Sequence, residues 1–123
     1  MVGRAASDIL TGWDEIIAIG LTLPGVETGT SYGQPALRFR NRTLAGMTAP
    51  DSDSFVLHVA VEAKEMLIDT DPATFWQTDH YDGWPAILVR FGTPAGERIK
   101  TLLTRAWWDR ATQRQRVAWG KRP

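Results

Sequence analysis

The sequence predicts an α+β domain in which a five-stranded antiparallel sheet carries helices on one face. Three observations lead to this prediction. Apolar residues alternate with other residues along several short segments, which is the pattern of half-buried strands. Turn-forming residues such as Asn41 and Pro50-Asp51 separate neighbouring segments, so the strands are expected to run antiparallel. Near both ends of the chain, apolar residues recur at helical spacing instead.

The first predicted helix ends at Pro24-Gly25, after a stripe made of Trp13, Ile16, Ile17, Gly20 and Leu21. The chain then crosses to the sheet through Gly29 and Gly33. No Lys-Ser or Lys-Thr follows these glycines, and a strand comes next where a phosphate-binding loop would need a helix. The glycines are therefore interpreted as positions of positive φ and close backbone approach.

The predicted order of elements is α-β-β-β-α-β-β-α. Asn41-Arg42 is predicted as the turn of the first hairpin, because Asn tolerates the left-handed backbone of a two-residue turn. We expect strands at residues 35–40, 43–48, 55–61, 75–78 and 86–91, and further helices at residues 62–69 and after Pro94. The last helix has its own apolar stripe, formed by Ile99, Leu102, Leu103, Ala106 and Trp107.

The length of 123 residues predicts one domain over residues 1–123. The chain has no Cys, which excludes disulfide frameworks, thiolate metal sites and cysteine nucleophiles. Neither a signal peptide nor an apolar run long enough to span a bilayer is recognisable. We therefore expect a cytoplasmic protein with no membrane partner.

Charge is unevenly distributed along a chain whose net charge is zero. Residues 1–104 carry eight basic and thirteen acidic side chains, whereas residues 105–123 carry six basic and one acidic. The basic C-terminal tail, from about residue 112, includes Arg114 and Arg116. It is either a handle for nucleic acid or a solvated helix end whose cations complement the helix dipole.

The strand alternation places Arg38, Arg40, His58 and Arg90 on the face of the sheet away from the helices, with Arg42 at the hairpin tip. Two interpretations remain open for the arginines. They contact phosphates, which guanidinium groups bind bidentately, or they are solvated charges that deter edge pairing. His58 is more typical of a half-buried, hydrogen-bonded side chain than of a ligand.

A second candidate site is the turn that contains His80, Tyr81 and Trp84, whose rings could bind a small polar ligand or stack on a base. The alternative is a turn that closes the core. Tyr32 and Trp108 are further candidates for ligand or partner contacts; Trp108 is predicted to lie off the apolar stripe and exposed.

The same turn also contains two carboxylates, Asp79 and Asp82, beside the imidazole of His80. Two carboxylates and one imidazole without a fourth ligand are weak grounds for a metal site. We predict no metal and no cofactor. The chain also contains no recognisable catalytic triad, so we expect a protein that binds rather than catalyses.

The residues resemble the signature of the MmcQ/YjbR family over residues 21–117. The matching segments are Leu23-Pro24-Gly25-Val26-Glu27, residues 29–38, Asp71-Pro72, Phe75, His80-Tyr81, Gly83-Trp84-Pro85 and Leu88-Val89-Arg90. The resemblance implies a CyaY-like fold, similar in outline to frataxin, and DNA binding through a double-wing arrangement, with no catalytic residues to transfer. Ala60-Val61 departs from the family, which often has Asp or Ser before the second helix.

The sequence therefore predicts weak, largely non-specific DNA binding through Arg38, Arg40, Arg42 and Arg90, helped by Arg114 and Arg116 of the tail. The alternative is a small-ligand or protein-interaction module that uses the turn from His80 to Trp84 and Trp108. The protein is expected to be a monomer or a weak homodimer.

Overall fold

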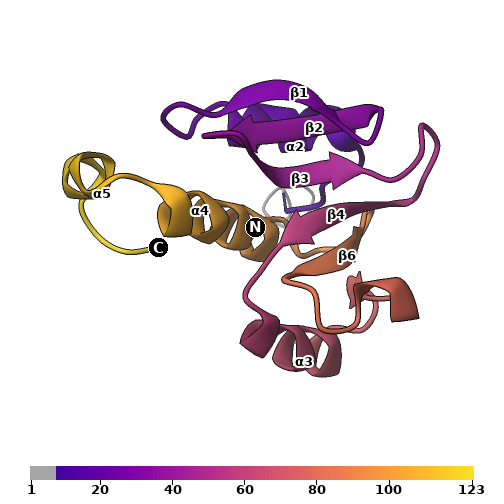
Figure 1. Ribbon diagram of the computed structural model, residues 1–123. Helices are drawn as coiled ribbons and strands as arrows, with labels where there is room; N and C mark the ends of the chain where they lie inside the picture. The colour runs from indigo at the N-terminus through magenta and orange to yellow at the C-terminus, as the bar shows by residue number, and fades with distance from the viewer. Residues whose placement is uncertain (1–7) are drawn as a thin grey trace.

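The computed structural model describes residues 8–123 and shows an α+β fold built on one antiparallel sheet (Figure 1). The sheet has six strands in the spatial order β1-β2-β3-β4-β6-β5, one more strand than the sequence predicts. The strands are β1 (Glu27–Ser31), β2 (Gln34–Phe39), β3 (Arg42–Met47), β4 (Ser54–His58), β5 (Phe75–Trp76) and β6 (Ala86–Arg90).

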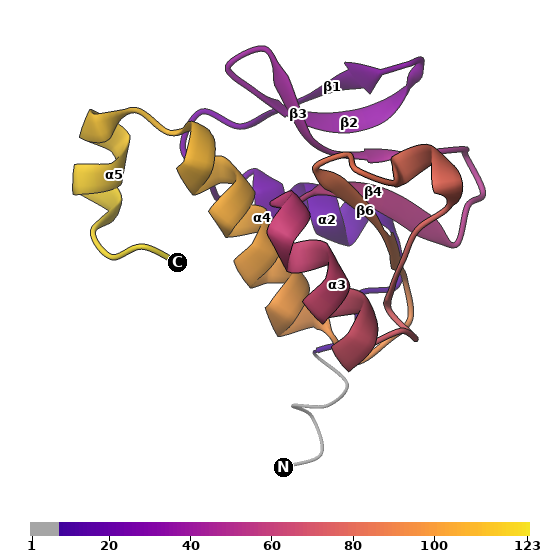
Figure 2. The same cartoon turned by 60° about the horizontal axis from the view of Figure 1, so that its bottom comes forward.

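Helices α2, α3 and α4 lie on one side of this sheet, and α5 lies beyond the end of α4 (Figure 2). A short 3-10 helix, η1, follows β5. The bounds are α2 (Trp13–Gly20), α3 (Val61–Thr70), η1 (Asp79–Tyr81), α4 (Gly96–Arg110) and α5 (Gln113–Trp119). The predicted basic tail is thus a separate helix for most of its length.

The additional strand is β1, where the sequence predicts only a crossing. It pairs with β2 from Glu27 opposite Arg38 to Ser31 opposite Gln34. A tight turn joins the two strands, with positive φ at Tyr32 (52°) and at the following glycine (77°). β1 is polar and almost entirely exposed, so its sequence has no apolar alternation from which a strand could be predicted.

The hairpin of β2 and β3 turns at Arg40-Asn41, where both residues have positive φ (51° and 65°). The predicted turn at Asn41-Arg42 is therefore wrong by one residue, and Arg42 begins β3. The register shifts between Leu37 and Arg38, which leaves Leu44 as the extra residue of a bulge. Bulges increase strand twist and re-aim side chains. This one lies just before the tip that carries Arg40 and Arg42.

The core lies between the sheet and the helices, as the apolar alternation predicts. Its fully buried side chains come from both layers: Ile16, Leu37, Leu44, Phe55, Leu57, Leu67, Phe75, Ile87, Val89, Ile99, Leu103 and Trp107. Trp107 of α4 lies against the rings of Phe39 and Trp119, with centroids 6.1 and 4.9 Å away. Its indole Nε1 donates a hydrogen bond of 2.8 Å to the carbonyl of Pro24.

The other face of the sheet is not open, contrary to the prediction. β5 ends at Trp76 rather than at Thr78, and the following segment folds over β4 and β6. Trp76 Nε1 donates to Ser54 Oγ at 3.1 Å. Leu88, which points to this outer face, is only 4% exposed. The segment after β5 therefore covers part of the surface that was expected to bind DNA.

The N-terminus of α4 is capped from far away in the sequence. Its own N-cap residue, Ala95, offers no side-chain acceptor. Instead the Asp8 carboxylate accepts from the backbone N–H of Glu97 at 2.6 Å, and the Asp8 carbonyl accepts from that of Gly96 at 2.7 Å. Over residues 8–123, no helix combines the length and the apolar character needed to cross a membrane.

Gly20 is a position where packing excludes any larger residue. A Cβ added there would collide with Cδ1 of Leu37 and come within 2.9 Å of its Cδ2, and Leu37 is fully buried. We expect Gly20→Ala to lower the free energy of unfolding by about 1–3 kcal/mol through overpacking. Urea denaturation measures the loss, with Gly12→Ala as the control because a Cβ at Gly12 meets nothing within 4 Å. Equal stability of the two variants would contradict the packing argument.

Candidate functional site

The arginines predicted on the outer sheet face do not form one surface. Arg38 donates to Thr43 Oγ1 at 2.7 Å, across the hairpin. Arg90 donates to the carbonyls of Pro72 and Ala73 at 3.1 and 3.3 Å, and its guanidinium lies 4.8 Å from the ring centroid of Trp76. Arg38 therefore stabilises the β2–β3 hairpin, and Arg90 stabilises the segment before β5.

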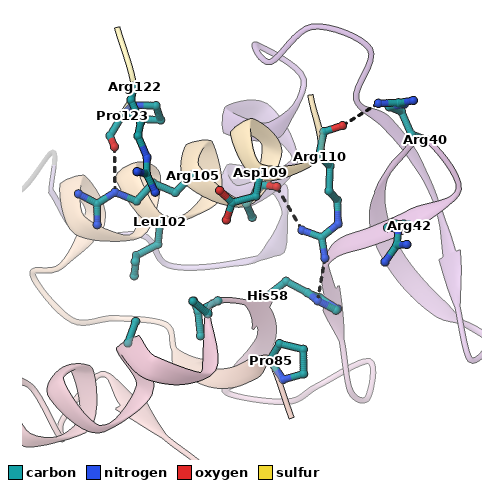
Figure 3. Close-up of a pocket in the computed structure, with 14 residues that line it drawn as sticks. Arg40, Arg42, His58, Pro85, Leu102, Arg105, Asp109, Arg110, Arg122 and Pro123 are labelled. Atoms are coloured by element: carbon teal, nitrogen blue, oxygen red, sulfur yellow. Dashed lines mark hydrogen bonds between the residues drawn. The ribbon is translucent and has the colours of Figure 1, made fainter. Parts of the chain in front are cut away.

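Arg40 and Arg42 are placed differently, because the bulged hairpin brings its tip to the C-terminal end of α4. Arg40 Nη1 donates to the carbonyl of Arg110 at 2.9 Å, which satisfies a carbonyl at the end of the helix. Both arginines line a cavity between this tip, the end of β4, the start of α3 and the second half of α4 (Figure 3). They are the part of the predicted phosphate-binding set that the structure brings together.

The cavity has a volume of about 1010 Å³ and combines a basic lining with an apolar one. Arg105 and Arg122 lie toward one end, and Arg40, Arg42 and Arg110 toward the other (Figure 3). Asp109 is the one acidic residue of the described chain among those that line it. The remaining lining residues are His58, Val59, Ala60, Ala63, Pro85, Leu102, Ala106 and Pro123.

Helical periodicity explains the contribution of α4. Leu102, Arg105, Ala106 and Asp109 follow the spacing i, i+3, i+4, i+7 and therefore share one face of the helix. Arg105 Nε donates to the carbonyl of Pro123 at 3.0 Å, which draws the C-terminal residues along this face. Arg105, Arg110 and Arg122 lie outside the phosphate-binding set that the sequence predicts. The sequence signal for them is the change of charge at residue 105, together with the helical spacing of the residues that follow.

His58 stays neutral in the cavity wall. Burial, followed by the charges of Arg110 and Arg42, lowers the pKa of His58 from 6.5 to about 4. Its Nδ1 accepts a hydrogen bond of 3.3 Å from Arg110 Nη2, so the ring proton resides on Nε2. His58 is therefore half-buried and hydrogen-bonded, as the sequence predicts, but it faces the cavity and not an open sheet surface.

Arg110 connects the two walls of the cavity. Its Nη1 donates to the carbonyl of Ala106 at 3.2 Å, while its Nε is buried without a hydrogen-bond partner in the described part of the chain. Desolvation and the nearby charge of Arg42 lower the pKa of Arg110, and Asp109 partly offsets them. The guanidinium remains charged, because an arginine pKa starts far above neutrality. The cavity thus concentrates positive charge with little internal compensation.

Arg114 and Arg116 of the tail do not line this cavity, whereas Arg122 does. Arg116 Nε donates to the carbonyl of Trp108 at 3.0 Å, and its guanidinium lies 5.4 Å from the centroid of the Trp108 ring. Trp108 is consequently half-buried against the core, and the prediction that it is exposed is wrong. A capping box between Thr112 and Gln115 starts α5. Arg114 is exposed on this helix.

The turn from His80 to Trp84 is anchored by a lysine. Lys64 is only 5% exposed, and its Nζ donates to the carbonyls of Tyr81 and Trp84 at 2.6 and 2.9 Å. Burial lowers the pKa of Lys64, and the carboxylate of Asp82 partly offsets this. The rings of His80 and Tyr81 meet edge to face at 4.9 Å. The turn therefore closes onto α3, as one of the two interpretations requires.

This turn also retains features of a contact site. A smaller cavity of about 340 Å³ includes His80 and Tyr81 in its lining, and Trp84 is 63% exposed. Tyr32, at the tip of the β1–β2 hairpin, is fully exposed and does not line the arginine-lined cavity. Among residues 8–123, no group of three or more His, Asp or Glu side chains could hold a metal ion.

Comparison with known proteins gives relatives but no family. The chain is 36% identical over 66 residues to an uncharacterized protein of Mycobacterium bovis and to two uncharacterized proteins of Mycobacterium tuberculosis. This alignment covers 53% of the chain, which spans about half the length of these curated relatives. No family model matches the chain, and no solved structure matches it.

Lys64 supplies the test of the anchored turn. Lys64→Met keeps most of the aliphatic stem but leaves two carbonyls without their donor, so we expect the free energy of unfolding to fall by about 1–3 kcal/mol. Chemical denaturation measures it, with the exposed Lys100→Met on α4 as the matched control. If both variants are as stable as the unsubstituted protein, Lys64 does not anchor the turn.

His58 supplies a pH test. Its pKa is about 4 in the folded state and 6.5 in the unfolded chain, so between these values the unfolded state binds more protons. The free energy of unfolding should therefore fall as the pH drops from 6.5 to 4, by at most about 3 kcal/mol and by less where solvent screens the ring. His58→Asn retains an acceptor near Nδ1 and should remove this component. Parallel stability profiles of the two proteins over this range would contradict it.

Proposed function

We propose that this protein binds DNA weakly and largely without sequence preference, with the DNA phosphates on the arginine-lined cavity. The observation that carries the proposal is that five arginines from three parts of the chain line one cavity together with a single acidic side chain, Asp109. Guanidinium forks match phosphate oxygens bidentately, and such contacts supply most of the non-specific affinity for DNA.

The cavity arginines differ in how many of their guanidinium N–H groups already donate hydrogen bonds within the protein. Arg40 and Arg110 make hydrogen bonds to backbone carbonyls, and Arg105 does so through Nε only, which leaves its terminal nitrogens for a ligand. Arg42 and Arg122 extend the same basic surface from the hairpin and from the C-terminal segment. Successive phosphates of a bound strand would therefore meet arginine donors at both ends of the cavity.

The proposal narrows the set of DNA contacts that the sequence predicts. Arg40 and Arg42 remain in it, whereas Arg38, Arg90 and Arg116 serve the internal contacts described above. Arg114 is exposed and is an additional contact for a ligand that extends beyond the cavity. Membership in the MmcQ/YjbR family, which the residues from Leu23 onward suggest, is part of the same proposal.

A second candidate function is supported by the turn from His80 to Trp84. The exposed indole of Trp84, at 63%, and the small cavity lined by His80 and Tyr81 fit a small-ligand or protein contact. Among the residues that the structure describes, the lining of this small cavity contains no arginine or lysine, whereas that of the large cavity is cationic. Binding at the large cavity should therefore weaken as the salt concentration rises, whereas binding at the small cavity should depend less on salt.

The test of DNA binding compares substitutions that each remove one positive charge, inside or outside the cavity. We expect Arg105→Gln and Arg42→Gln each to weaken binding of a labelled duplex and to reduce the slope of log K against log salt by about 0.9, one phosphate contact each. Lys100→Gln removes the same charge from α4 outside the cavity and should change neither. Fluorescence anisotropy from low to physiological salt measures both quantities. Equal effects of all three substitutions would overturn the assignment to the cavity.

A further inference from the structure

The shape of the cavity restricts what can enter it. Its volume of about 1010 Å³ is that of a small-molecule site, and seven of its lining residues are apolar: Val59, Ala60, Ala63, Pro85, Leu102, Ala106 and Pro123. A DNA duplex presents its phosphates on a convex surface, so a duplex reaches the rim of such a recess. The apolar wall between α3 and α4 is then left uncovered. A ligand that fills the recess needs an anionic group and a less polar body.

The start of α3 adds donors to the same recess. The N-cap residue, Ala60, has no side-chain oxygen, and no side-chain hydrogen bond caps the helix. The first N–H groups of a helix carry the positive end of its dipole. In α3 the N–H of Ala63 already donates to the Ala60 carbonyl at 3.0 Å, so the donors offered to an anion are the N–H groups of Val61 and Glu62. Ala60 and Ala63 both line the cavity. An anion held by the arginines would therefore also approach N–H groups that nothing in the described chain caps through a side chain.

The charge balance favours a doubly charged anion. A phosphate monoester carries a charge of about −1.5 to −2 at neutral pH, whereas each internal phosphodiester of a nucleic acid carries one negative charge. Five arginines and one acidic side chain, Asp109, line this cavity. After burial, the charge of Arg42 is the next cause that lowers the pKa of Arg110, so these two arginines repel each other. A dianion relieves this repulsion more completely than a monoanion.

We infer that the cavity binds a nucleoside phosphate monoester, either a free nucleotide or the phosphorylated end of a single strand. The phosphate lies against Arg42, Arg110 and the start of α3, and the nucleoside lies against the apolar wall formed by Ala63, Leu102 and Ala106, toward Arg105. This inference rests on the proposed function, because it assigns the same arginines to a phosphate, and it specifies which phosphate they prefer.

The experiment uses one single-stranded oligonucleotide in three forms, with a phosphate at the 5′ end, at the 3′ end or at neither end. We expect one phosphorylated form to bind about tenfold more tightly than the unphosphorylated form by fluorescence anisotropy at physiological salt. A nucleoside monophosphate should displace it, whereas the corresponding nucleoside should not. Equal affinity of the three forms overturns the inference and leaves general DNA binding standing. Failure of every nucleic acid to bind overturns both.

Two kinds of variant assign the preference to the cavity. Arg42→Gln should abolish the difference between phosphorylated and unphosphorylated strands, and Lys100→Gln should keep it. Ala60→Asp places a carboxylate at the N-cap of α3, where it caps the helix and repels a phosphate. It should raise the thermal midpoint of unfolding and reduce the preference for the phosphorylated end. If Ala60→Asp stabilises the protein without changing that preference, the start of α3 does not face the ligand.

Discussion

The burial of Trp107 is the interaction on which the rest of the structure depends. Its fully buried indole lies between Phe39 of β2 and Trp119 of α5, and its Nε1 holds the carbonyl of Pro24, where the chain leaves α2. One side chain thus joins the hairpin, the two C-terminal helices and the first crossing. Because it fixes the rotation of α4 beneath the hairpin, it also decides which face of α4 looks toward Arg40 and Arg42.

The sequence predicts the fold class and most elements because burial in this protein follows regular periods. Phe55, Leu57, Ile87 and Val89 alternate and all lie in the core, and the stripe around Leu103 identifies α4. β1 cannot be predicted in this way, because its residues are polar and exposed and show no apolar alternation. Backbone pairing with β2 is what makes it a strand. α5 is missed for a similar reason: none of its residues is buried, so it has no apolar stripe to predict it from.

The site was harder to predict than the fold, for physical reasons that individual arginines make clear. Alternation places Arg38 and Arg90 on one side of a strand, but it does not say that backbone carbonyls and a threonine hydroxyl take up their donors. It also assumes a flat strand. The bulge at Leu44 and the positive φ of Arg40 turn the hairpin tip toward α4, so Arg40 and Arg42 meet Arg105 and Arg110 from a distant segment.

The order of the elements along the chain has a consequence for biogenesis. All six strands precede α4, yet α4 supplies Trp107 and one wall of the cavity, and its N-terminus is completed by Asp8 from the opposite end of the described chain. During synthesis all six strands therefore emerge from the ribosome before α4, which supplies much of the apolar cover of the sheet. The nascent sheet must stay unpaired with other chains during that interval, which is the circumstance in which cells use chaperones.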